Sequence, residues 1–295
     1  MLLDRIEPVE LESRYELVEK VGGSERFPVY FGRRRQDGRV VAVKRLPGGR
    51  AMPMARVEGK SPYMARHPHL LPTLDFVVGD TCAWIVTPFM ARGSLADRVW
   101  FGDPLPQPVA IGVLYPIADA LDKMHSAGLV HQDVKPGNVL LDVYDRPMLA
   151  DFGLVVWERS PYILPRSGGT PGYMAPEVER GIEAGSPASD VYSFAVMARE
   201  ILIGARSKDL DVPVPRPPTP ERLADSQLDS LRAGMSRRAV ERPASCVELL
   251  RPLLRELGAQ SGSCAKCRSV VIAFEPALAR HCAVYPHCEP TADGW

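Results

Sequence analysis

One stretch of sequence decides the fold. Residues 131–138 read HQDVKPGN, and after a short apolar run residues 151–153 read DFG. Within the first motif, Asp133 can accept a proton from an attacking hydroxyl group, and Lys135 can neutralise charge on a phosphoryl group in transfer. Phosphoryl transfer needs little covalent help from a protein, because it depends on bound metal, neutralised charge and an oriented nucleophile.

The residues between the two motifs predict a hairpin. Residues 139–141 and 148–150 are apolar, and the Asp-Arg-Pro sequence between them is typical of a turn. Such a hairpin would bring Asn138 and Asp151 side by side. Amide and carboxylate oxygens are ligands that Mg²⁺ prefers, so the sequence predicts a magnesium site formed by these two side chains.

The two motifs, in this order and at this separation, resemble the catalytic loop and the metal-binding triplet of protein kinases. The resemblance implies an α+β, bilobal protein-kinase-like fold, with a small β-rich N-lobe and a larger helical C-lobe. It also implies ATP and Mg²⁺ as cofactors and a protein hydroxyl as acceptor. The expected divisions are a lead-in at 1–14, a kinase domain at 15–256 (N-lobe 15–87, hinge 88–91, C-lobe 92–256) and a tail at 257–295.

The catalytic loop departs from the family pattern at one position. Protein kinases usually carry Arg immediately before the catalytic Asp, whereas this chain carries Gln132. In such kinases that Arg typically binds a phosphorylated activation segment. The sequence therefore predicts a kinase of the non-RD type, which lacks this Arg-Asp pair and does not depend on that phosphate clamp.

The N-terminal part predicts a β-meander that resembles the nucleotide-binding lobe of kinases. Residues 15–21 alternate in character, two glycines break the pattern, a strand resumes at 29–32, and a turn leads into 40–44. The last strand matches the one whose Lys holds the α- and β-phosphates of ATP, which implies that role for Lys44.

The glycine-rich loop of this lobe is degraded. Counting back from Val29, the three glycine positions of the family motif hold Gly22, Ser24 and Phe27; the alternative is that the loop has lost one residue and the alignment shifts. Fewer glycines allow less close approach of the backbone to phosphate. On their own, the two glycines favour an ordinary hairpin turn over a phosphate-binding loop.

A Glu partner for Lys44 is expected from the helix that follows. Residues 67–71 read HPHLL and resemble the segment just after that helix, which places the partner at Glu58. Pro53 and Pro62 lie on either side of it, and proline inside a helix costs ~3 kcal/mol or more, so the helix is expected to be short. The alternative is that Glu58 is a solvated charge.

Residues 84–90 resemble the last N-lobe strand and the hinge. Thr87 falls on the gatekeeper position and is small. Pro88 keeps a carbonyl group that can accept from adenine, and Met90 offers a backbone N–H. The residues expected to contact the nucleotide are Val21, Gly22, Val29, Ala42, Lys44, Thr87, Pro88, Met90, Asn138, Leu140 and Asp151.

Residues 151–177 resemble a kinase activation segment. Its end, GTPGYMAPE at 169–177, is close to the Ser/Thr-kinase form, and Lys135 two residues after Asp133 also favours Ser or Thr as acceptor. Ser160, Tyr162, Ser167 and Thr170 are possible modification sites within the segment or simply exposed polar residues.

Three further residues have structural roles by the same resemblance. Asp190 is expected to bind the backbone of the catalytic loop, and Arg242 is expected to pair with Glu177.

Apolar residues at helical spacing predict a helix over 108–127 that leads to the catalytic loop.

The tail concentrates cysteine and histidine. A C-x2-C pair followed by further soft ligands predicts a tetrahedral Zn²⁺ site that would stabilise a unit too small for its own core. The candidate ligands are Cys264, Cys267, Cys282 and Cys288, with His281 and His287 as alternatives for the last two positions. The other interpretation is a frayed tail with free thiols.

Composition narrows the remaining function classes. The formal net charge is +0, with 36 basic and 36 acidic residues, so no nucleic-acid partner is expected. No apolar run approaches the ~20 residues of a membrane span, and the N-terminus lacks the apolar core of a signal peptide, so a cytoplasmic protein is expected.

Three functions remain, and in one of them the zinc-binding tail carries the activity while the kinase lobes regulate it. The first is a Ser/Thr protein kinase in which Asp133, Lys135, Lys44 and Glu58 carry the catalytic roles. The second is a pseudokinase that serves as a scaffold, which the degraded glycine-rich loop favours. A partner protein could bind through the tail or through the proline-rich residues 212–220, although a stiff surface loop is the simpler interpretation of the latter.

Overall fold

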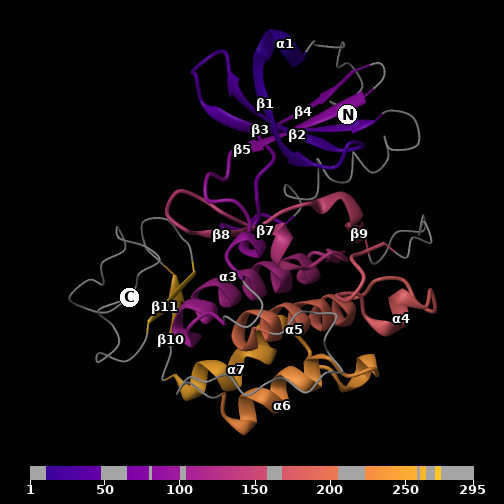
Figure 1. The fold of residues 1–295 in the computed structure, drawn as a ribbon. Helices are drawn as coiled ribbons and strands as arrows, with labels where there is room; N and C mark the ends of the chain where they lie inside the picture. The colour runs from indigo at the N-terminus through magenta and orange to yellow at the C-terminus, as the bar shows by residue number, and fades with distance from the viewer. Residues whose placement is uncertain are drawn as a thin grey trace.

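The computed structural model has a β-rich lobe above a helical lobe (Figure 1). This arrangement matches the fold class expected from the sequence. The structure describes residues 11–47, 65–79, 82–99, 104–157, 168–204, 223–257, 260–263 and 270–273.

The N-lobe is an antiparallel sheet with the strand order β1-β2-β3-β5-β4. Its strands are β1 (Tyr15–Gly23), β2 (Pro28–Arg34), β3 (Val40–Pro47), β4 (Asp75–Val78) and β5 (Cys82–Pro88). Val41, Val43 and Val86 are buried on one face, as the period of two in a strand requires. The short helix α1 (Leu11–Arg14) adds Leu11 to the same core cluster.

The first strand is longer than the sequence predicted. The two glycines that were expected to break it lie inside β1, where Gly22 pairs with Val29 and Gly23 pairs with Pro28. Gly23 has a φ of 74°, which glycine adopts without steric cost. The predicted break was therefore wrong, and residues 24–27 form the connection instead.

The C-lobe is built around a buried helix. Its helices are α3 (Gln107–Ser126), α4 (Pro176–Glu179), α5 (Pro187–Ile203), α6 (Asp225–Gly234) and α7 (Cys246–Glu256). Most of α5 is buried, including Phe194 and Met197 at 0% exposure, which is typical of a helix enclosed on all sides. The helix begins at an N-cap, Ser186, and ends at Gly204 in the left-handed region.

Short elements complete the fold, and some of them carry the catalytic motifs. They are the strands β6 (Leu129–Val130), β7 (Val139–Leu141), β8 (Pro147–Leu149) and β9 (Val156–Trp157), and the 3₁₀ helices η2 (Leu95–Asp97), η3 (Pro136–Asn138), η4 (Phe152–Leu154) and η6 (Ala239–Glu241). The pairing of β7 with β8 confirms the predicted hairpin, and α3 confirms the helix predicted over 108–127.

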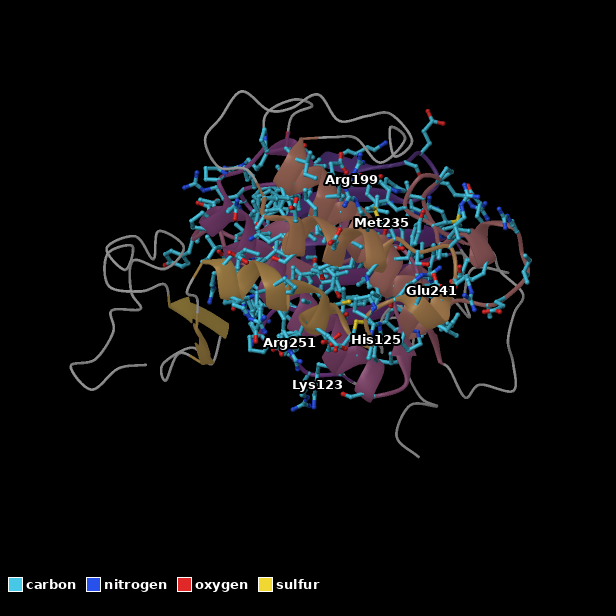
Figure 2. All side chains as sticks on the ribbon, turned by 90° about the horizontal axis from the view of Figure 1, so that it is seen from below. Lys123, His125, Arg199, Met235, Glu241 and Arg251 are labelled. Carbon is cyan, nitrogen blue, oxygen red and sulfur yellow. The ribbon has the colours of Figure 1, made fainter. Side chains whose placement is uncertain are left out.

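A two-stranded sheet lies at one side of the C-lobe (Figure 1). Strands β10 (Gln260–Ser263) and β11 (Val270–Ala273) pair antiparallel, and β11 lies beside α3 (Figure 1). From below, Figure 2 shows Lys123 and Arg251 pointing outward from α3 and α7.

Among the described residues, no helix has both the length and the apolar character needed to cross a membrane. The proline-rich residues 212–220 lie outside the described ranges.

Candidate active site

Asp190 holds the catalytic loop in place. It lies near the start of α5 with 0% exposure, and its carboxylate accepts the backbone N–H of His131 at 2.7 Å and that of Gln132 at 2.8 Å. His125 contacts the same carboxylate at 2.8 Å. A buried carboxylate needs such partners to remain stable, so the loop conformation and the burial of Asp190 support each other. This contact confirms the predicted role of Asp190.

Asp133 is surrounded by hydrogen-bond donors. Its Oδ1 accepts the Thr170 hydroxyl at 2.7 Å, and its Oδ2 accepts Lys135 Nζ at 2.7 Å and Asn138 Nδ2 at 2.9 Å. Lys135 Nζ also donates to Thr170 Oγ1 at 2.5 Å. These contacts fix the direction of the carboxylate and place a cation beside it. The cluster can orient a hydroxyl group and neutralise charge that develops nearby.

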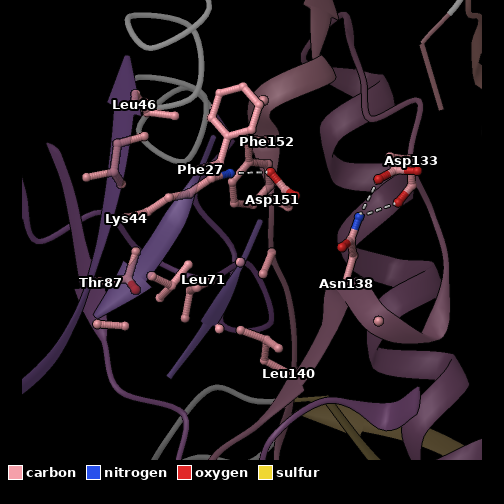
Figure 3. Close-up of a pocket in the computed structure, with 18 of the residues that line it drawn as sticks. Phe27, Lys44, Leu46, Leu71, Thr87, Asp133, Asn138, Leu140, Asp151 and Phe152 are labelled. Atoms are coloured by element: carbon pink, nitrogen blue, oxygen red, sulfur yellow. Dashed lines mark hydrogen bonds and ion pairs between the residues drawn. The ribbon is translucent and has the colours of Figure 1, made fainter. Parts of the chain in front are cut away.

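The β7–β8 hairpin brings the second motif to the first. The backbone N–H of Ala150 donates to the carbonyl of Asn138 at 2.8 Å. Asp151 follows directly, in the left-handed region with φ of 63°. In Figure 3 the amide nitrogen of Asn138 faces Asp133 and its oxygen points away from it. The donor set of one amide oxygen and one carboxylate fits the chemistry of Mg²⁺.

Lys44 reaches across from the N-lobe to Asp151. It lies on β3 between its partners Val29 and Ile85, and its Nζ is 2.7 Å from Asp151 Oδ1. Burial alone would raise the pKa of Asp151, but the nearby Lys44 ammonium outweighs it and lowers that pKa. Asp151 is therefore ionised, and it connects the two lobes directly (Figure 3).

A cavity of about 610 Å³ lies between these groups and the sheet. The expected nucleotide contacts that line it are Val21, Gly22, Val29, Ala42, Lys44, Thr87, Asn138, Leu140 and Asp151, and Asp133 joins them. Pro88 and Met90 are not part of this lining; Met90 is only 8% exposed. The cavity thus brings together nine of the eleven residues expected to contact the nucleotide, and the contacts themselves stay predictions.

Sequence reasoning missed several residues that line the cavity. They are Gly23, Ser24, Phe27, Leu46, Leu71, Thr73, Ile85, Gly137, Ala150, Phe152, Gly153 and Leu154. A signal existed for two of them, because Leu46 follows Ala42 and Lys44 at the spacing of one strand face, and Ile85 precedes Thr87 in the same way. Position in a motif was a signal for most of the others, because Gly137, Ala150 and residues 152–154 lie in or beside the catalytic motifs, and Gly23, Ser24 and Phe27 lie in or beside the glycine-rich loop. Leu71 and Thr73 carried no such signal.

A buried ion pair supports the end of the activation segment. Arg242 donates to the two carboxylate oxygens of Glu177 at 2.6 and 2.7 Å, and its side chain is 0% exposed. Burial would raise the pKa of Glu177, but the hydrogen bond and charge of Arg242 lower it. The pair confirms the prediction made for these two residues. It fixes α4 against the segment before α7.

The remaining expected residues lie outside the described ranges. Glu58 is one of them, and so are all six candidate zinc ligands of the tail. Within the ranges that the structure does describe, no three His, Cys, Asp or Glu side chains gather as a metal site.

Comparison with known proteins agrees with this geometry. A family model described as "Protein kinase domain" matches residues 15–210. The chain belongs to the protein kinase family. The catalytic loop, the Asp-Phe-Gly triplet and the Lys44 strand all lie within the matched range.

Curated relatives are serine/threonine-protein kinases from plants, bacteria and yeast. The CBL-interacting serine/threonine-protein kinase 2 of Arabidopsis thaliana is 31% identical over 207 residues, which are 67% of this chain and 45% of the plant protein. PknK of Mycobacterium tuberculosis strain H37Rv is 33% identical over 196 residues, 62% of this chain and 17% of that protein. GIN4 of Saccharomyces cerevisiae is 34% identical over 141 residues, 48% of this chain and 12% of that protein. This chain therefore spans less than half the length of these relatives.

Proposed function

We propose that this chain is a Ser/Thr protein kinase that transfers the γ-phosphate of ATP to a hydroxyl group of a protein. The observation that carries the proposal is the hydrogen-bonded cluster of Asp133, Lys135 and Thr170, in which Asp133 lines the same cavity as Lys44 and Asp151. The names of the curated relatives also support Ser or Thr as acceptor. ATP as the donor favours a cytoplasmic location.

Each residue of the cluster has a role in this reaction. Asp133 orients the acceptor hydroxyl and takes its proton, and Lys135 neutralises charge on the transferring group. Lys44 positions the α- and β-phosphates, while Asn138 and Asp151 would hold Mg²⁺. When bound, Mg²⁺ neutralises the charge of the phosphate oxygens.

Two finer features are part of the proposal. The enzyme is of the non-RD type because Gln132 precedes Asp133. It also works with a degraded glycine-rich loop, in which Gly22 and Gly23 still line the cavity. The proposed partner of Lys44 is Glu58; a Glu58→Gln variant with an unchanged rate of transfer would contradict that pairing.

Transfer of labelled γ-phosphate tests the main proposal. We expect label on Ser or Thr, in the protein itself or in a generic protein acceptor, when Mg²⁺ is present. Asp151→Asn should fold and should lose the label, because it loses an ionised metal ligand. A folded wild-type protein that binds ATP but transfers nothing would favour the alternative function, a scaffold that uses the kinase fold to bind partners.

We also propose that the tail holds one structural Zn²⁺ ion. Cys264 and Cys267 form the C-x2-C pair of the tail. Thiolates at this spacing favour tetrahedral Zn²⁺. We expect one equivalent of zinc in the purified protein and less in Cys264→Ser. Zinc content equal in both proteins would exclude the thiol of Cys264 as a ligand.

Such a tail would also be a candidate surface for a partner protein, as would residues 212–220. Removal of bound zinc with a chelator should reduce partner binding through the tail, but it should leave binding through the proline-rich residues intact.

A further inference from the structure

Gln132 is held at both its backbone and its side chain. Its backbone N–H donates to Asp190 at 2.8 Å, and its side-chain Nε2 donates to the backbone carbonyl of Leu154 at 2.5 Å. The residue is 8% exposed and has a φ of 68°. A non-glycine residue in this region is strained, and it persists where surrounding contacts hold it. Gln132 is therefore fixed at the one position directly before Asp133.

The space around the Gln132 side chain is tightly filled. A Cβ atom added at Gly185 would lie 2.5 Å from Gln132 Oε1 and 2.6 Å from its Cγ. Gly185 is in the turn before α5 and leaves room for the amide only because it has no side chain. The amide is thus enclosed between this turn and the carbonyl of Leu154.

Gln132 also lies where both described ends of the activation segment meet. At its start, the Leu154 side chain lies against Gly168, where an added Cβ would be 3.0 Å from Cδ2. At its other end, an added Cβ on Gly169 would lie 3.1 Å from the Gln132 carbonyl oxygen. Thr170 follows directly and donates to Asp133 at 2.7 Å. The position of Thr170 therefore depends on residues that Gln132 contacts.

We propose that Gln132 is a positioning residue that holds Leu154 and thereby keeps Thr170 on Asp133 without covalent modification of the activation segment. The inference rests on the proposed kinase function. An amide that donates to a backbone carbonyl is a neutral hydrogen bond, and the chain as translated supplies both partners. No phosphate group is needed to form it.

The test uses Gln132→Met on the full chain. Methionine keeps the length of the side chain and removes the donor. The matched control is Gln227→Met, because Gln227 is 1% exposed and hydrogen-bonded but lies in α6, away from the cavity. All proteins are treated with phosphatase, and intact mass confirms that no phosphate remains. We expect kcat to fall about tenfold in Gln132→Met with KM for ATP within about twofold, and kcat to be unchanged in the control.

Gly185→Ala tests the same contact from the other side. Its added methyl group should displace the Gln132 amide and therefore lower kcat, as Gln132→Met does. In the double variant the two losses should be less than multiplicative, because both remove one contact. Fully multiplicative losses would show that the two residues act independently and would overturn the proposal.

A second measurement does not depend on activity. Hydrogen exchange of residues 154–157 and 168–173, without nucleotide, should be faster in Gln132→Met than in wild type or Gln227→Met. Equal exchange overturns the inference, as does a phosphatase-treated wild type that transfers phosphate only after it is phosphorylated again. If neither the wild type nor any variant transfers phosphate, the proposed function fails, and the exchange rates alone decide whether Gln132 holds the segment.

Discussion

Thr170 connects the two charged groups of the catalytic loop. Its hydroxyl donates to Asp133 at 2.7 Å and accepts from Lys135 at 2.5 Å. Thr170→Ala leaves both groups without this partner, and hydrogen bonds to charged groups are worth more than neutral ones, so we expect kcat to fall about tenfold or more. Thr170→Ser keeps the hydroxyl and should restore most of the rate. Steady-state kinetics on a peptide acceptor would measure both. An alanine variant as active as the serine variant would exclude this role.

His69 makes stability depend on pH. It is 1% exposed, and burial lowers its pKa from 6.5 to about 4, although its hydrogen bond to the Pro147 carbonyl opposes this effect. His67 and Arg146 lower the pKa further, and Asp119 raises it. Between these two pKa values the unfolded chain binds a proton that the folded chain does not, so the free energy of unfolding falls as pH falls.

The size of this effect follows from the pKa difference. One pKa unit corresponds to about 1.4 kcal/mol, so this residue should cost about 3 kcal/mol of stability between pH 6.5 and pH 4. Urea denaturation at several pH values would measure it. His69→Asn keeps a donor for Pro147 and does not titrate, so its stability should depend less on pH over this range. If the free energy of unfolding depended on pH equally in the wild type and in His69→Asn, the prediction would be wrong.

At the scale of elements, the Glu177–Arg242 pair joins α4 to the segment before α7. Arg242→Met leaves a buried carboxylate without its partner, and breaking a buried pair in this way costs about 3–5 kcal/mol. The matched control is Arg232→Met, which breaks an ion pair whose side chains are 71% and 69% exposed and should cost about 1 kcal/mol or less. Denaturant unfolding of both variants compares them. If the two variants lost the same free energy of unfolding, burial would not strengthen the Glu177–Arg242 pair.

Elements whose signals are local were predictable from the sequence. The β7–β8 hairpin and α3 follow from turn signals and periodicity, whereas the contact of Asp190 with the catalytic loop follows from the resemblance to protein kinases. The path of β1 through Gly22 and Gly23 was not predictable, because a glycine pair is compatible both with a break and with a continuous strand that bulges. Pairing with β2 decided between them.

At the scale of the whole molecule, the contacts that could not be predicted join parts distant in sequence. Lys44 meets Asp151 across the two lobes, Phe27 enters the cavity from the β1–β2 connection, and Gln132 meets Leu154. Each of these contacts depends on how separate elements pack, and no local pattern encodes that packing. The expected catalytic residues and the anchoring residue Asp190 follow from the resemblance to kinase motifs, but the contacts of Lys44 with Asp151 and of Gln132 with Leu154 do not.

The cavity between the lobes predicts that a nucleotide stabilises the whole molecule. Lys44 belongs to the N-lobe sheet and Asp151 to the C-lobe, so a nucleotide with Mg²⁺ bound to both joins the two lobes. A ligand at 100 times its Kd adds about 2.7 kcal/mol to the free energy of unfolding, so the melting temperature should rise with ATP and Mg²⁺. Lys44→Met should reduce the rise in melting temperature both with ATP alone and with ATP and Mg²⁺. Asp151→Asn should remove only the part of the rise that requires Mg²⁺. If Asp151→Asn instead retained the full Mg²⁺-dependent rise, Asp151 would not be the metal ligand and the assignment of the magnesium site would be wrong.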